Sequence, residues 1–112
     1  MAYSEKLAGR IRESLSPVKK VVEKEMMGGL TFMVNGKMCV GIFRDELMCR
    51  IDPKRQNEAL EKPGSKIMKF TGRPMKGFIQ VDDTGMRTKR DFDYWIGLCL
   101  EFNKVAKASK KR

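Results

Sequence analysis

Apolar residues recur at every fourth position near the start of the chain, which is the spacing of a helix with one buried face. The stripe consists of Tyr3, Leu7, Ile11 and Leu15. Ser4 stands where its side chain can cap the first turn, and Pro17 disfavours helical backbone at the residue before it. The pattern therefore predicts an amphipathic helix that begins after Ser4 and ends near Ser16.

Between residues 21 and 52 the pattern changes to short apolar runs rich in β-branched residues. Gly28 and Gly29 separate the first two runs, and Asn35-Gly36 separates the second from the third. Asn-Gly between two such runs is the strongest short-range hairpin signal, because both residues tolerate positive φ. A two-residue turn pairs Val34 with Lys37, Met33 with Met38, Phe32 with Cys39 and Thr31 with Val40. Residues 47–52 then alternate as a half-buried strand does, so we expect antiparallel strands throughout this region.

The second half of the chain predicts a short helix, two more strands and a long helix. Pro53 suits the first turn of the short helix, which Pro63-Gly64 ends, and strands are expected at 66–70 and 75–82. Thr88 with Asp91 resembles a capping box. The final helix carries one apolar face, made of Phe92, Trp95, Ile96, Cys99, Phe102 and Ala106. The expected fold class is α+β: an antiparallel β-sheet flanked by an N-terminal helix, a short central helix and a long C-terminal helix, with the helices on one face.

Length and charge add a basic tail to this picture. The chain of 112 residues fits one domain, and its 24 Lys and Arg against 14 Asp and Glu give a net charge of +10. Residues 104–112 contain five basic residues and no acid, which is half of the excess. We expect one domain over 1–106 and a disordered basic tail over 107–112. No apolar run approaches the roughly 20 residues of a membrane span, and no signal peptide is evident, so we expect a cytoplasmic protein without membrane contact.

Sulfur is the most conspicuous candidate chemistry. Residues 26–52 contain five of the nine methionines and two of the three cysteines, while the chain has no histidine. Without histidine the common zinc sites and the Ser-His and Cys-His nucleophile pairs cannot form. Cys39, Cys49 and Cys99 lack metal-site spacing, so we interpret them, like the methionines, as packing residues. We therefore expect no enzyme, no metal, no cofactor and no small-molecule substrate; a small cysteine-dependent enzyme is the alternative.

Residues 27–29, 35–38 and 70–75 read Met-Gly-Gly, Asn-Gly-Lys-Met and Phe-Thr-Gly-Arg-Pro-Met. With the aromatic-rich final helix, these segments resemble the N-terminal domain of the TfoX/Sxy family of bacterial competence regulators, from about Ser4 to Ala106. The resemblance implies an α+β domain without a known catalytic site or cofactor. It also implies a structural role for the motif residues Gly28, Gly29, Asn35, Gly36, Gly72, Arg73 and Pro74. Two departures are Met27, where the family often has Phe, and the competence regulators' second, helical domain, which nothing here matches.

What the resemblance implies about function is a non-enzymatic regulatory or binding domain coupled to transcription, through a protein partner or DNA. The charge pattern offers an alternative, a small basic protein that binds nucleic-acid phosphates non-specifically and with steep salt dependence. Its candidate contacts are Lys104, Lys107, Lys110, Lys111 and Arg112. Further basic residues would assist if the fold brings them together: Lys19, Lys20, Arg87, Lys89 and Arg90. A solubilising role of the tail is the other interpretation.

The final helix also raises the question of self-association. Residues 93–102 are apolar over a wide arc, and Gly97 would let another backbone approach closely. Two explanations stay open from the sequence: a homodimer through this helix, or a neighbouring helix of the same chain that covers the second side.

Overall fold

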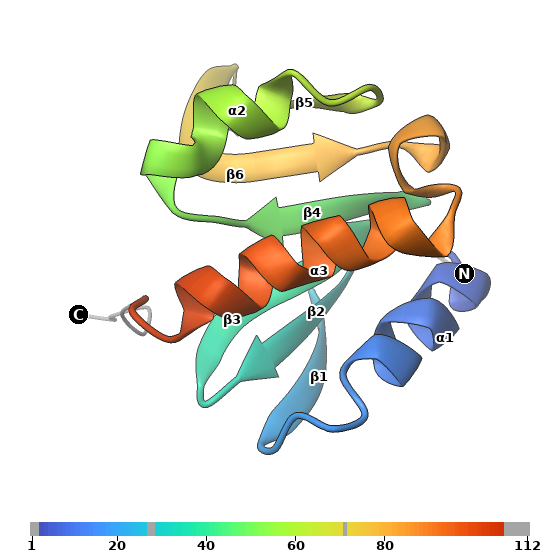
Figure 1. Cartoon of the computed structure of the whole chain (residues 1–112). Helices are drawn as coiled ribbons and strands as arrows, with labels where there is room; N and C mark the ends of the chain where they lie inside the picture. The colour runs from blue at the N-terminus through green and yellow to red at the C-terminus, as the bar shows by residue number, and fades with distance from the viewer. Residues whose placement is uncertain (1–2, 27–28, 71, 107–112) are drawn as a thin grey trace.

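Three α-helices lie on one face of a six-stranded antiparallel sheet in the computed structural model, which describes residues 3–26, 29–70 and 72–106 (Figure 1). The helices are α1 (Glu5–Ser14), α2 (Gln56–Leu60) and α3 (Lys89–Asn103), and the short 3-10 turns η1 (Pro53–Arg55) and η2 (Asp83–Met86) precede the last two. The strands are β1 (Val21–Met26), β2 (Gly29–Val34), β3 (Lys37–Phe43), β4 (Glu46–Arg50), β5 (Ser65–Phe70) and β6 (Arg73–Val81). The motif residue Gly28 and the expected tail over 107–112 lie outside the described residues.

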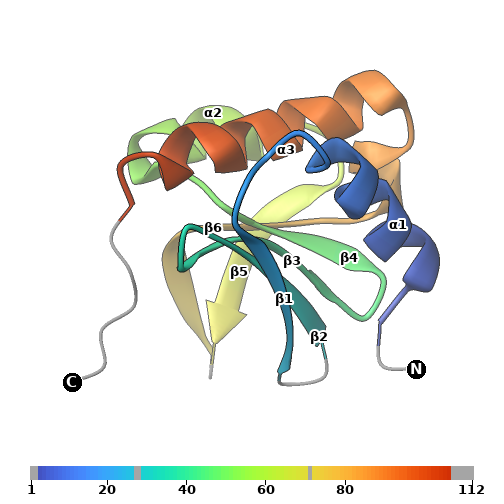
Figure 2. The same ribbon diagram turned by 90° about the horizontal axis from the view of Figure 1, so that it is seen from below.

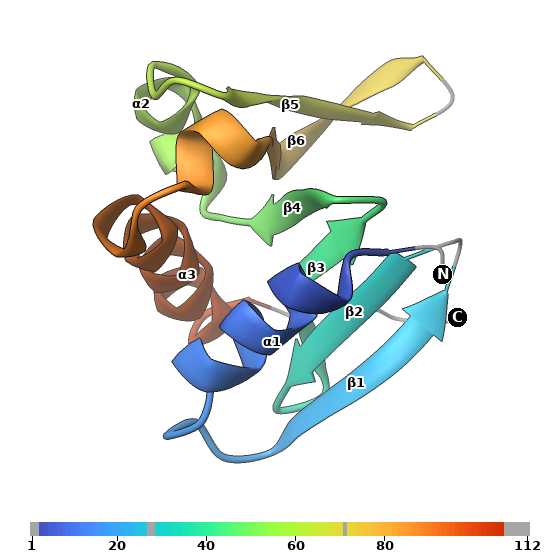
Figure 3. The same cartoon turned by 90° about the vertical axis from the view of Figure 1, so that its right-hand side faces the viewer.

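The strand order within the sheet is β1-β2-β3-β4-β6-β5, and every neighbouring pair is antiparallel. The first four strands follow one another as a meander, whereas β6 pairs with β4 and leaves β5 at the edge. Figures 2 and 3 show the helices together on one side of this sheet. The predicted fold class is confirmed, and so is the expectation that the helices share one face.

The first helix forms as its sequence pattern predicts. The Ser4 hydroxyl accepts a hydrogen bond from the Leu7 N–H at 3.1 Å, which satisfies one of the free donors of the first turn. Leu7, Ile11 and Leu15 are buried against the sheet. Tyr3 lies just before the helix and forms an isolated bridge with Arg44, so it ties the chain's start to the β3–β4 turn.

The Asn35-Gly36 turn has the predicted geometry, with φ of 55° and 77° at the two residues. The pairs Val34–Lys37 and Met33–Met38 are confirmed. The next two predicted pairs are wrong, because the register shifts between Phe32 and Met33, so that Phe32 lies opposite Val40 and Thr31 opposite Gly41. Cys39 is the extra residue of this β-bulge, and both Cys39 and Val40 are fully buried. The bulge thus places two consecutive apolar side chains in the core, which strict alternation cannot do.

The last helix crosses β3 and β4 and closes the core (Figure 1). The Thr88 hydroxyl caps it by accepting the Asp91 N–H at 3.1 Å, as predicted. Trp95 is buried, and its Nε1 donates a hydrogen bond to the Gly85 carbonyl at 3.1 Å. At the other end of the helix, Asn103 Nδ2 donates to the Val34 carbonyl at 3.3 Å. Polar contacts at both ends therefore fix the position of α3 over the sheet.

Candidate binding surface

Cys39 and Cys49 lie on the strands beneath α3, Cys99 lies on the buried face of α3 itself, and each thiol is fully buried. Burial, together with a smaller contribution from the nearby Cys99, raises the pKa of the Cys39 thiol to about 12. Burial also holds the pKa of Cys99 well above its usual range, and a hydrogen bond with Cys49 acts in the same direction. A reactive cysteine needs exposure and a lowered pKa, so Cys39 and Cys99 have the surroundings of structural residues.

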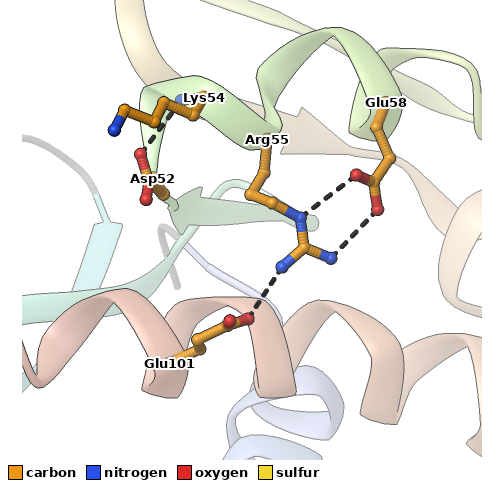
Figure 4. A network of polar contacts seen from close by, with 5 residues as sticks. All are labelled: Asp52, Lys54, Arg55, Glu58 and Glu101. Carbon is orange, nitrogen blue, oxygen red and sulfur yellow. Dashed lines mark hydrogen bonds and ion pairs between the residues drawn. The ribbon is translucent and has the colours of Figure 1, made fainter.

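A cluster of polar contacts joins the start of α2 to α3 (Figure 4). Arg55 binds both carboxylate oxygens of Glu58, at 3.1 and 2.9 Å, and its Nη1 donates to Glu101 at 2.9 Å. The hydrogen bond with Arg55 lowers the pKa of Glu58 and, in return, raises the pKa of the guanidinium. Nearby, Asp52 caps η1 by accepting the Lys54 N–H at 3.0 Å. One guanidinium thus holds two carboxylates, Glu58 of α2 and Glu101 of α3, and clamps the two helices together.

The structure also bears on metal binding and membrane insertion. Within the described residues, no three Cys, Asp or Glu side chains come together as a metal site would require. The helices of the described segments are all too short or too polar to cross a bilayer.

The basic residues proposed to contact nucleic acid fall into two groups. Lys104 is exposed at the end of α3, whereas Lys107, Lys110, Lys111 and Arg112 lie outside the described residues. The Lys20 carbonyl accepts the Asn35 N–H, and Asn103 holds the same turn against α3. The turn that carries Lys19 and Lys20 therefore lies at the end of α3 where Lys104 is found.

The second group lies at the opposite end of the same helix. Arg87 pairs with Asp83 at 3.0 Å and Lys89 with Asp93 at 2.8 Å, which offsets both charges. Arg90 follows in the first turn of α3. A helix of 15 residues is about 22 Å long, so the fold separates these residues from Lys104 rather than bringing them together.

The wide apolar arc of α3 is covered from two sides by the same chain. On one side the Arg10 guanidinium of α1 stacks 4.2 Å from the centre of the Phe92 ring. On the other side the Lys62 ammonium lies 4.5 Å from the centre of the Tyr94 ring. Gly97 remains exposed in a groove of about 740 Å³ between α1 and α3. A neighbouring helix thus covers part of the second side, and the homodimer stays a prediction.

The sheet has one surface opposite the helices (Figure 3), and the strand register places a group of apolar residues on it. Side chains alternate along a strand, and directly paired residues point to the same side. The strand register therefore places five apolar side chains of β1 to β4 on this surface, here named the open face: Val22, Met33, Met38, Phe43 and Met48. Val22 is 54% exposed and the other four are half-buried. None of the helices and strands in the described part of the chain covers the open face.

The centre of the open face is closely packed. Gly41 lies between Thr31 and Met48 in the register, and a Cβ at Gly41 would come within 2.9 Å of the Met48 Cε. The Met48 side chain therefore lies across Gly41, next to Thr31, which is only 4% exposed. Met48 therefore lies flat on the sheet at the centre of the open face.

Charged residues border the open face, and most of them are basic. Lys24 pairs with Thr31 in the register and so shares this side, and the Arg44 guanidinium lies 5.2 Å from the centre of the Phe43 ring. Lys66 lies 3.9 Å from Glu46, which also accepts a hydrogen bond from Gln80 at 2.7 Å. We name Lys24, Arg44 and Lys66 the basic rim. Lys66 is paired with Glu46, whereas no carboxylate in the described part of the chain pairs with Lys24 or Arg44, so these two carry the excess positive charge.

The sequence interpretation treated the methionines as packing residues scattered over both faces of the sheet, and it did not single out this surface. The signal was present in two places: Met48 alternates with Leu47 and Cys49, and Met33 faces Met38 across the hairpin. Only the helix positions show which face stays uncovered.

The model of a family described as the TfoX N-terminal domain matches residues 13–103. Neither the curated proteins nor the solved structures gave a significant match to this chain.

Proposed function

The chain belongs to the TfoX N-terminal domain family, since the family model covers residues 13–103 of its 112 residues, and on that premise we propose that it is a non-enzymatic regulatory or binding domain. The observation that carries this proposal is the open face, an apolar surface on one side of the sheet that the described helices leave uncovered. The burial of all three thiols supports it, because the most nucleophilic groups lie in the core.

The motifs shared with competence regulators support a finer proposal about its setting. We propose a role in transcription regulation in the bacterial cytoplasm, with a protein of the transcription machinery as the partner. The partner would cover the open face and exclude water from its methionines.

Photo-crosslinking in the native cell tests this role. A benzoylphenylalanine placed at Met33 should form an adduct with another protein, because Met33 lies on the open face. The same residue placed at Lys6, which is exposed on α1 and away from the sheet, is the control. Equal yields at the two positions, or no adduct from Met33, would contradict a binding role for this surface.

Thiol labelling separates this proposal from the cysteine-dependent enzyme. In the folded protein, Cys39, Cys49 and Cys99 should react only at the rate of unfolding, because each is fully buried. Fast reaction of one of them at mildly acidic pH would support the enzyme instead.

A second candidate function is non-specific binding to nucleic-acid phosphates. The observation that favours it is the gathering of the Lys19-Lys20 turn and Lys104 at one end of α3, from which the basic residues 107–112 continue. Binding of this kind depends steeply on salt, because its free energy comes from counterion release.

The test is titration with duplex DNA at low and physiological salt. Replacing Lys104, Lys107, Lys110, Lys111 and Arg112 with Gln should abolish binding at low salt. Replacing Arg87, Lys89 and Arg90, at the other end of α3, is the control and should leave the affinity nearly unchanged. Unaltered binding after the first set of replacements would show that the tail is not a nucleic-acid arm.

A further inference from the structure

The open face and the basic rim together specify the chemistry of a partner. We propose that this surface binds an amphipathic segment of another protein that presents apolar side chains together with Asp or Glu. This inference rests on the proposed binding function and adds the class of partner. Two features carry it: the adaptable apolar centre and the sign of the charges around it.

Methionine supplies three of the five side chains of the open face. Its unbranched thioether chain is flexible and polarizable, so a methionine surface can adjust to apolar groups of different shapes. Met33 and Met38 form a cross-strand pair, and Met48 lies across Gly41 on the neighbouring strands. The apolar side chains of a partner would thus meet a continuous patch that spans β2, β3 and β4.

The basic rim selects the polar side chains of that partner. Lys24 is exposed at one side of the patch, Arg44 stacks on Phe43 at one end, and Lys66 is exposed beyond β4 and β6. Glu46 is the acid among them and is already engaged by Gln80 and Lys66. Acidic groups beside the apolar anchors would therefore meet the positive charges of Lys24 and Arg44, which favours them over basic groups.

Two other occupants fit the surface less well. A second copy stacked on the same face would bring two basic rims together, and each copy already carries a net charge of +10. An anionic membrane attracts a basic rim, but insertion needs apolar side chains that project from the surface. On the open face, Val22 is 54% exposed and the other four residues are half-buried, so few apolar side chains project from it.

The experiment uses the full chain with 13C-labelled methionine methyl groups. The probe is a synthetic amphipathic helical peptide of leucine and glutamate, and its counterpart has lysine in place of glutamate. The glutamate peptide should shift the methyl signals of Met33, Met38 and Met48 and leave that of the buried Met86 unchanged. Stronger binding of the lysine peptide, shifts confined to other methionines, or no shift with either peptide would overturn the proposal.

Charge reversal tests the rim separately from the net charge. Lys24→Glu should weaken binding of the glutamate peptide by about threefold or more, as loss of one favourable exposed charge contact and gain of a repulsive one predicts. Lys19→Glu makes the same change in net charge on an exposed turn away from the open face, and should weaken binding clearly less. Equal effects of the two variants would show that only net charge matters, which would contradict a specific role of the basic rim in binding.

Further measurements distinguish other partners that could bind the open face. Methyl shifts at Met33 and Met38 that depend on protein concentration without peptide would indicate a second copy instead. Binding to phosphatidylglycerol vesicles through the same methyl groups, without binding to the glutamate peptide, would indicate a lipid surface. A crosslinked protein at Met33 in the cell, together with no binding of the glutamate peptide, would reject the acidic partner while keeping the binding role.

Discussion

At the scale of single residues, the polar atoms of Trp95 and Tyr94 differ in whether they form a hydrogen bond. Trp95 is buried and its Nε1 donates to the Gly85 carbonyl, whereas the Tyr94 hydroxyl is buried without a hydrogen-bond partner among the described residues. Trp95→Phe should lower the free energy of unfolding by about 1–3 kcal/mol, since a buried carbonyl loses its donor and the core loses volume. Urea denaturation measures the change.

Tyr94→Phe is the matched control on the adjacent residue. It removes a hydroxyl that already lacks a partner, so it should leave the free energy of unfolding unchanged or raise it. A larger loss from Tyr94→Phe than from Trp95→Phe would contradict the contacts described for this helix.

The buried thiol of Cys39 predicts a dependence of stability on pH. Its pKa is raised to about 12 in the folded protein, so the unfolded chain loses this proton at a lower pH than the folded one. The stabilisation is therefore complete below the unfolded pKa and decreases as the pH rises from there toward 12. Between pH 8 and pH 10, wild type should lose about 2 kcal/mol more stability than Cys39→Ala. Urea denaturation of both proteins at the two pH values measures the difference, and equal losses would contradict it.

At the scale of secondary-structure elements, the two faces of the sheet predict different responses to the same substitution. Val22 and Val34 lie on the neighbouring strands β1 and β2, but Val22 is 54% exposed on the open face and Val34 is 3% exposed beneath the helices. Val22→Lys should change the free energy of unfolding by less than about 0.5 kcal/mol. Val34→Lys should cost more than about 3 kcal/mol, because it buries an unpaired charge. Thermal unfolding by circular dichroism distinguishes them, and a large loss from Val22→Lys would show that the open face is covered.

The contact between Asn103 and the β2–β3 turn gives a prediction for the end of α3. Asn103 is 4% exposed. Its side-chain amide donates to the Val34 carbonyl, and its backbone carbonyl accepts from Lys37 Nζ at 2.6 Å. Asn103→Ala should lower the free energy of unfolding by about 1–2 kcal/mol, because a buried carbonyl loses a donor. Asn57→Ala, at an exposed position in α2, is the control and should have little effect. Equal effects of the two variants in urea denaturation would contradict this role for Asn103.

The elements themselves could be predicted from the sequence more fully than their pairing. Ser4, Asn35-Gly36 and Thr88 act through their immediate neighbours, and their predicted roles are confirmed. The predicted pairing of Phe32 with Cys39 was wrong because of the bulge at Cys39. The bulge places Cys39 and Val40 together in the core, and a local sequence pattern does not contain such packing. Gly29 shows the same limit: a Cβ there would clash with the Ile42 carbonyl of β3, a contact that exists only once the strands pair.

At the scale of the whole molecule, the strand order and the open face were beyond the sequence. Nothing in the patterns of β4, β5 and β6 indicates that β6 is inserted beside β4. The open face depends on that order and on all three helices lying on the same side, so its methionines could be recognised only as a half-buried pattern. The thiols, by contrast, were correctly predicted to lie in the core, because the lack of histidine excludes the common zinc sites and Cys-His nucleophile pairs.

The position of α3 gives a prediction for the molecule as a whole. The helix covers β3 and β4, including the fully buried Val40, Cys49 and Leu47. A chain that ends at residue 86 leaves this surface in water and should show no cooperative unfolding transition. A chain that lacks only residues 107–112 keeps every described contact and should unfold at nearly the wild-type urea concentration. A cooperative transition in the shorter chain would contradict the role of α3.

The strand order has a last consequence, for the two strands that end the sheet. β1 and β5 each have one side whose backbone groups pair with no other strand in the described structure, and such edges can nucleate fibrils. β1 carries Glu23, Lys24 and Glu25 in succession, and β5 carries Lys66 and Lys69 on either side of a register shift. Charges and irregular pairing at an edge discourage another chain from adding to it. Despite its apolar open face, the sheet therefore has built-in protection against growing from one molecule into the next.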